Sequence, residues 1–224
     1  QHQTKTLKAV KDVTGFSENN IIINTTLMGG AFGRRLETDF VTQAVMISKS
    51  IKKPVQVIWS REEDTRQGFY RPTSMCRFQV GIDKDGFPSQ WESQTAQPNL
   101  LARYAKPLKW LDFDPFAIAG SVHDYPVLTK HFYDIDEVNL KHQGVELGVP
   151  IGNWRSPPNS INVFYTESVI DELAYLAQED PLHYRLKLIK NSPRHKKVLE
   201  EVAKMAEWGK DLDDGYGLGI AIND

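Results

Sequence analysis

The stretch MGGAFGRR, residues 28–35, separates the β-branched run IIINTTL (21–27) from the apolar-periodic run LETDFVTQAVMISKSI (36–51). The first run predicts a strand and the second a helix, so the glycines form a strand-to-helix turn. The turn lacks the G-x-G-x-x-G spacing of a dinucleotide site, and arginines after Gly33 exclude a phosphate-loop ending. Glycines still let the main chain approach a ligand closely, and N–H groups at a helix start favour an anion. A tight turn that binds nothing is the alternative interpretation.

The composition is that of an ordinary globular protein and excludes several functional classes. Of the 224 residues, 40% are apolar and 25% charged, and the formal net charge of −2 provides no basic field for nucleic acid. The single cysteine, Cys76, excludes an internal disulfide framework and a thiolate-only metal site in this chain. From the net charge we expect a chain that binds no nucleic acid. Since no apolar stretch is long enough to span a bilayer, we also expect that it is not transmembrane.

Periodicity predicts the elements of the first third of the chain. Apolar spacing indicates a helix over 3–13 and another over about 37–51, and the run VQVIWS (55–60) indicates a strand. Strand, turn, helix and strand in this order favour a right-handed crossover unit over residues 21–60. The acidic run 62–64 is interpreted as a solvated or capping turn after the second strand.

The rest of the chain has a different pattern. Asp85-Gly86 supplies the turn of a hairpin between strands 75–82 and 90–96, and residues 98–126 indicate a packed loop. Helices are predicted over 164–177, over 181–190 and over 194–207. In the first of these, the residues predicted to point inward are Phe164, Ile170, Leu173 and Leu176 or Ala177. The histidines show no metal-ligand spacing, so no metal ligand is assigned. These elements predict an α+β fold, a mixed sheet with packed helices.

Because the chain opens on Gln1 and stops within an apolar alternation, residues 1–224 are interpreted as a fragment truncated at both ends.

Several motifs together resemble one enzyme family. MGGAFGRRLE resembles the Gly-Gly-Gly-Phe-Gly segment of the molybdenum hydroxylases, the xanthine dehydrogenase and aldehyde oxidase family, in the double-arginine form of the isoquinoline 1-oxidoreductase beta-subunit-like branch. Further matching segments occur in the family's order: QHQTK (1–5), KPVQVIWSREEDTRQGFYRP (53–72), GNWRSPPNS (152–160) and FYTESVIDELAYLAQEDPLHYRLKLI (164–189). The resemblance covers nearly the whole chain and implies a portion of the molybdopterin-binding domain.

The resemblance also implies which residues bind the cofactor. Gln1 stands 31 positions before Phe32, as does the family's glutamine whose side chain approaches an oxygen ligand of molybdenum. The implied cofactor-binding residues are Gln1, Gly29, Gly30, Ala31, Phe32, Gly33, Trp154 and Arg155. The family's catalytic carboxylate lies beyond Asp224, so no catalytic residue is assigned.

The activity implied by the resemblance is hydroxylation of an aldehyde or an N-heterocyclic substrate with water as the oxygen source. The implied cofactor is molybdenum-molybdopterin in its cytosine dinucleotide form, and we expect the isolated fragment to carry none and to be inactive. An iron–sulfur small subunit or domain is the expected partner, because this chain lacks the cysteines for such clusters. The family branch implies the bacterial periplasm, with the cytoplasm as alternative. A nucleotide-binding α/β module without redox activity is the alternative function.

Overall fold

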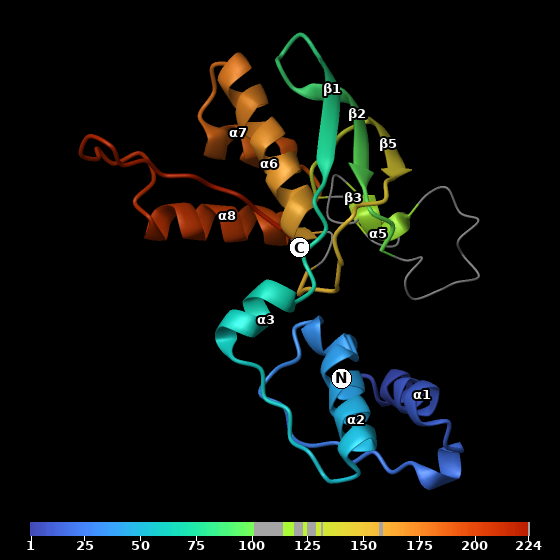
Figure 1. Cartoon of the computed structure of the whole chain (residues 1–224). Helices are drawn as coiled ribbons and strands as arrows, with labels where there is room; N and C mark the ends of the chain where they lie inside the picture. Colours follow the sequence, from blue (N-terminus) through green and yellow to red (C-terminus); the bar gives the residue numbers. More distant parts are fainter. Residues whose placement is uncertain (101–113, 119–122, 125–128, 131, 157–158, 224) are drawn as a thin grey trace. The chain divides into compact units, whose positions relative to one another are not determined.

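The computed structural model describes residues 1–100, 114–118, 123–124, 129–130, 132–156 and 159–223. The chain divides into two compact units, which we call unit 1 (residues 1–72 and 147–157) and unit 2 (residues 73–146 and 158–224). Unit 1 contains α1 (Gln3–Thr14), η1 (Glu18–Asn20), η2 (Arg34–Leu36), α2 (Asp39–Ile51) and α3 (Arg61–Gln67). Unit 2 contains β1 (Met75–Ile82), β2 (Pro88–Gln97), α5 (Pro115–Ile118), β3 (His123–Asp124), β4 (Thr129–Lys130), β5 (Glu137–Gly144), α6 (Asn159–Leu176), α7 (Pro181–Leu188) and α8 (Pro193–Met205) (Figure 1).

The two predicted helices of unit 1 are confirmed, and they pack against each other. Helix α1 ends at Gly15, whose φ of 77° lets its N–H donate to the carbonyl of Lys11. Helix α2 ends at Lys52, which takes a left-handed φ of 55° two residues before Pro54. Gly15 favours the left-handed conformation that ends α1, and Pro54 prevents α2 from continuing.

The prediction of two strands in unit 1, over residues 21–27 and 55–60, is wrong. Residues 21–28 and 54–60 run without helix or strand assignment, although Val55, Val57 and Trp59 alternate with more exposed neighbours. A strand is defined by ladder hydrogen bonds to a neighbour, and among the described residues neither segment has one. The predicted crossover unit over 21–60 is consequently not formed within the described chain.

A third helix of unit 1 was not predicted. Helix α3 covers the acidic run that was interpreted as a capping turn, and the hydroxyl of Ser60 accepts the N–H of Glu63 at 3.2 Å. Its first turn carries three carboxylates, where the helix dipole favours them. The acidic run therefore forms the start of a helix.

The predicted hairpin of unit 2 is confirmed. Strands β1 and β2 pair antiparallel from Met75 opposite Ala96 to the turn. The carboxylate of Asp83 accepts the N–H groups of Asp85 and Phe87, each at 2.9 Å. Gly86 takes the positive φ, 82°, that this turn requires.

Strand β5, which was not predicted, completes the sheet. It pairs parallel with β2, from Gln90 opposite Glu137 to Gln97 opposite Gly144, so the order is β1-β2-β5 and the sheet is mixed. With the helices this confirms the α+β class. Most of the predicted loop 98–126 lies outside the described residues, and its described part includes α5 and β3.

The core of unit 2 forms around α6, α7, α8 and Trp91 of β2. Ile170 and Leu173 are buried as predicted, but Phe164 is 67% exposed, so its predicted inward position is wrong. The buried residues of α6 include the polar Asn162, Thr166 and Glu167, and a buried stripe that is partly polar cannot be found from apolar periodicity.

Candidate functional site

The Gly-rich turn of unit 1 has an unusual backbone. Gly30, Phe32 and Gly33 have φ values of 109°, 52° and 79°. Glycine adopts such angles freely, whereas a phenylalanine there is strained. A Cβ at Gly30 would lie 2.5 Å from Cζ of Phe32, so the ring stands directly over the glycine. With 54% of Phe32 exposed, this strained and solvent-facing ring is an outlier of the kind found at functional sites.

The turn contacts a loop that lies far along the chain, residues 151–156. A Cβ at Gly33 would lie 2.7 Å from the carbonyl oxygen of Asn153, an approach that only glycine permits. The loop itself is bound to residues 69–71. Trp154 donates its indole N–H to the carbonyl of Phe69 at 2.8 Å, and Gly152 donates its N–H to the carbonyl of Tyr70 at 2.9 Å.

Arg71 fixes the far end of the same loop. Its guanidinium donates to the carbonyl of Arg155 at 3.0 Å and to that of Ser156 at 3.3 Å. Because the carbonyl of Arg155 is engaged, the peptide plane at this residue is set by hydrogen bonding. The loop is therefore ordered along its length by main-chain and side-chain bonds to 69–71.

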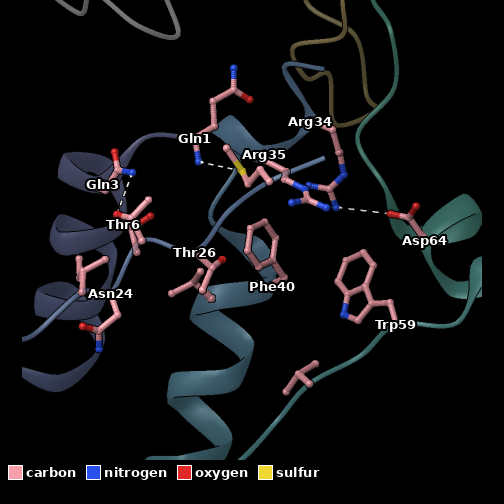
Figure 2. A pocket seen from close by; sticks show the side chains of 15 residues that line it. Gln1, Gln3, Thr6, Asn24, Thr26, Arg34, Arg35, Phe40, Trp59 and Asp64 are labelled. Carbon is pink, nitrogen blue, oxygen red and sulfur yellow. Dashed lines mark hydrogen bonds and ion pairs between the residues drawn. The ribbon is translucent and has the colours of Figure 1, made fainter. Parts of the chain in front are cut away.

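A cavity of about 510 Å³ opens next to the turn, within unit 1 (Figure 2). Amides and hydroxyls make up much of its lining, together with two arginines, and the amino group of Gln1 lies 3.9 Å from Sδ of Met28. The lining residues are Gln1, Gln3, Thr6, Ile23, Asn24, Thr25, Thr26, Met28, Arg34, Arg35, Phe40, Val41, Val57, Trp59 and Asp64. Such a lining suits a ligand with several hydrogen-bonding groups.

Arg34 dominates the electrostatics beside the turn. Its two terminal nitrogens donate to the two carboxylate oxygens of Asp39 at 3.0 and 2.8 Å, and Asp64 lies 3.8 Å away. The hydrogen bond to Asp39 raises the pKa of Arg34 despite partial burial. Its Nε is buried without a hydrogen-bond partner in the described chain, as is Nδ2 of Asn153. Two unpaired donors therefore lie close to the turn.

A buried acid also lies at the contact between the turn and the loop. Glu37, at the end of the 3₁₀ turn η2, is only 5% exposed, and one of its oxygens would lie 3.5 Å from a Cβ placed at Gly152. Lys5 of α1 brings its ammonium within 3.8 Å of the other oxygen. The exit of the turn is thus connected both to the loop and to α1.

The structure brings most of the predicted site residues together. The turn from Gly29 to Gly33 adjoins the loop that holds Trp154 and Arg155, and Gln1 lines the cavity beside Met28, one residue before the turn. Neither the turn nor Trp154 and Arg155 lines that cavity, so the predicted residues occupy two adjoining places. Their role toward a cofactor stays a prediction.

The described residues offer few other candidates for chemistry. They contain no cluster of three or more His, Cys, Asp or Glu side chains that could hold a metal ion. Cys76 is half-buried, with its thiol 3.1 Å from the hydroxyl of Thr95, and burial raises its pKa. Among the helices that the structure describes, none has the length and apolar character required to cross a bilayer.

Comparison with known proteins identifies the family. Residues 1–96 match the model of the molybdopterin cofactor-binding domain. The chain is 29% identical to the beta subunit of isoquinoline 1-oxidoreductase from Brevundimonas diminuta, over 93% of this chain and 26% of that protein. It is 24% identical to the molybdenum-binding subunit of an aldehyde oxidoreductase from Escherichia coli, over 75% of this chain and 21% of that protein. The chain thus spans about a quarter of the length of these relatives.

Solved structures show the same fold. The aldehyde oxidoreductase of Desulfovibrio gigas superimposes with a TM-score of 0.68 at 15% identity, over 90% of this chain and 22% of that one. The quinoline 2-oxidoreductase of Pseudomonas putida 86 gives 0.67 at 16% identity, over 90% and 27%. Residues 1–96 therefore belong to a molybdopterin cofactor-binding domain of the molybdenum hydroxylase family, and the sequence similarity to the beta subunit of isoquinoline 1-oxidoreductase extends over most of the chain.

Sequence reasoning missed several residues that shape the site. Arg34 was noted as a departure from the phosphate-loop pattern and as part of the double-arginine motif, but not as a structural residue. Its partner Asp39 lies five positions on, outside the usual helical pair spacing. Phe69 and Arg71 fall in a segment that was quoted for family resemblance alone. The available signal was an arginine directly after a glycine turn, followed by an acid at the start of a helix.

Proposed function

We propose that unit 1 forms part of the molybdopterin site of an oxidoreductase that hydroxylates an aldehyde or N-heterocyclic substrate with water as oxygen source. The observation that carries this proposal is the contact between Gly33 and Asn153, which joins the Gly-rich turn to the loop of Trp154 and Arg155. The match of residues 1–96 to the molybdopterin cofactor-binding domain supports it. The alternative of a nucleotide-binding module gains no support, since the predicted crossover unit is not formed by the described residues.

The residues present fit such a cofactor. A phosphorylated pterin is anionic and carries many acceptors, and a donor beside the turn is available: Nδ2 of Asn153 has no hydrogen-bond partner in the described chain. A Cβ at Gly29 would meet nothing within 4 Å, so the first part of the turn is open to an approaching ligand. Arg35 is exposed and lines the adjoining cavity.

We assign the following roles to this chain's residues. Gln1, the turn from Gly29 to Gly33, Trp154 and Arg155 hold the cofactor, with main-chain N–H groups and the glutamine amide as donors. The ring of Phe32 covers one side of the turn and limits the access of water there. When bound, the molybdenum centre supplies the two-electron oxidation of the substrate carbon. The carboxylate that takes up the proton released from the attacking oxygen is not among the residues assigned to this chain.

Three finer features belong to the same proposal. The cofactor is the cytosine dinucleotide form, an iron–sulfur subunit or domain receives the electrons, and the enzyme works in the bacterial periplasm. Both relatives described above are named as subunits, one of an isoquinoline 1-oxidoreductase and one of an aldehyde oxidoreductase, which supports a multi-subunit enzyme.

The test uses the longer natural protein with its partner subunit and the substitution Phe32→Asp. The new carboxylate faces an anionic cofactor, so molybdenum and pterin content, measured by mass spectrometry and by pterin fluorescence, should fall at least about tenfold. Phe16→Asp is the matched control, because Phe16 is 56% exposed in the same unit and lies away from the turn in sequence. Normal molybdenum content and activity in the Phe32 variant would refute the proposal.

A further inference from the structure

Arg34 is held in one orientation at the exit of the Gly-rich turn. Both of its terminal nitrogens bond to the carboxylate of Asp39, at 3.0 and 2.8 Å, and only 14% of its side chain is exposed. This two-point geometry fixes the plane of the guanidinium as well as its position. Asp39 in turn is the first residue of α2, so the arginine is tied to a rigid element.

The same guanidinium lies against two aromatic rings from the segment after α2. Its carbon is 5.6 Å from the ring centre of Trp59 and 5.6 Å from that of Phe69. Contacts of a cation with the face of an aromatic ring are attractive at this distance, more so when water is largely excluded. Figure 2 shows Trp59 and Asp64 on the side of the cavity where Arg34 lies.

Phe69 is also the residue that holds the distant loop. Its carbonyl accepts the indole N–H of Trp154 at 2.8 Å, while its ring contacts Arg34. On the other side, Gly33, directly before Arg34, touches the backbone of Asn153. Arg34 therefore belongs to a closed ring of contacts, which we call the circuit: Arg34 contacts Phe69, Phe69 binds Trp154 of the loop, and Asn153 of the loop contacts Gly33, the neighbour of Arg34.

We propose that Arg34 is a positioning residue that couples the Gly-rich turn to the loop 151–156, by clamping Phe69 against the turn while Asp39 fixes its plane. The circuit gives the two loops one mutual arrangement, as a ligand held by both requires. Lysine is a poor replacement, since its ammonium lacks the planar fork that forms two parallel bonds to the oxygens of Asp39 and lies flat on a ring. The coupling depends on this chain alone, whereas its consequence for a cofactor rests on the function proposed above.

Hydrogen exchange measured by mass spectrometry on the 224-residue chain tests the coupling. In Arg34→Lys the amides of 29–37 and those of 151–156 should both exchange about tenfold faster. Arg66→Lys is the matched control: it is an exposed arginine on α3 of the same unit, and its exchange should equal that of the unaltered chain. A residue that merely supports its own turn would change 29–37 alone, and this outcome, or no change in either segment, would overturn the proposal.

A second variant is needed because Arg34→Lys could speed exchange simply by loosening the whole of unit 1. Phe69→Leu removes the ring but keeps the carbonyl that binds Trp154, so it breaks the circuit without removing a charge. It should raise exchange in both 29–37 and 151–156 while leaving α1 unchanged. If either segment keeps its original rate in Phe69→Leu, the coupling is refuted.

The longer natural protein separates this inference from the proposed function. There, Arg34→Lys should lower molybdenum content, and Arg66→Lys should not. If Phe32→Asp retains molybdenum while Arg34→Lys speeds exchange in both loops, the proposed function fails and the coupling stands. If Phe32→Asp loses molybdenum and Arg34→Lys leaves 151–156 unchanged, the function stands and the coupling fails.

Discussion

Gly33 shows how one residue determines the distance between two segments. Alanine there would need a φ of 79° and would place its Cβ 2.7 Å from the carbonyl oxygen of Asn153. Each effect is unfavourable, and the clash with a main-chain atom cannot be relieved by a rotamer change. We expect Gly33→Ala to lower the free energy of unfolding by about 1–3 kcal/mol, measured by urea denaturation.

Gly29→Ala is the internal control for that measurement. A Cβ at Gly29 meets no atom within 4 Å, so its substitution should change stability by less than about 0.5 kcal/mol. Equal losses in the two variants would show that glycine flexibility, and not the contact with Asn153, decides the effect. The sequence predicted that Gly33 belongs to a turn, but the proximity of Asn153 arises from tertiary structure and has no local signal.

At the scale of elements, helix α7 is capped at its start by Asp180, whose carboxylate accepts three hydrogen bonds. Asp180 accepts the N–H groups of Leu182 and His183 at 2.9 and 3.0 Å, and its second oxygen accepts the indole N–H of Trp208 at 2.9 Å. Burial works against ionisation of Asp180, but these donors outweigh it and lower its pKa. Asp180→Ala should cost about 0.5–2 kcal/mol at neutral pH, the usual loss for a helix cap, measured by urea denaturation.

The lowered pKa of Asp180 also predicts a pH dependence. The unfolded chain protonates this carboxyl near its ordinary value of about 3.9, so the stabilisation is fully present above that pH and is lost as pH falls through the folded pKa. Asp180→Asn keeps the cap but removes the charge, and it should flatten the fall of the melting temperature below about pH 4. Asp12→Asn, which removes an exposed carboxylate of α1 in unit 1, is the comparison variant. Identical slopes in all three proteins would contradict this prediction.

Elements differ in how far they could be predicted. Helix α7 was predicted because Pro181 opens it, and the hairpin because Asp85-Gly86 has a local turn geometry. Residues 21–27 and 55–60 have strand-like composition, yet a strand also requires a neighbour at the right register, and local sequence does not encode one. Strand β5 was missed for the converse reason, because its polar sequence pairs with β2 through main-chain bonds.

At the scale of the whole molecule, a buried arginine with two carboxylate partners connects α7 to α6 within unit 2. Arg185, which is fully buried, donates to Glu167 at 2.9 Å and to Asp171 at 2.6 Å, and Glu167 also accepts from Tyr133 and from the N–H of Ile222. Arg185→Met would leave Glu167 buried without its cation and should cost about 3–5 kcal/mol in urea unfolding. The double variant with Glu167→Met should recover part of that loss, since the unpaired charge is gone. A double variant as unstable as the sum of both single variants would contradict this account.

The two units should also differ in stability. Apart from Pro72, every aliphatic or aromatic side chain that the described chain buries fully belongs to unit 2, and α1 and α2 of unit 1 bury none of their residues. Because burial of apolar surface is the main source of stability, local opening of unit 1 should be far easier. We expect amides at the centre of α2 to exchange at least about 100-fold faster than those at the centre of α6, measured by hydrogen exchange at neutral pH. A ligand that binds folded unit 1 would lower exchange there and leave α6 unaffected. Equal protection of α2 and α6 in the 224-residue chain would mean that stability is shared across the molecule, against this prediction.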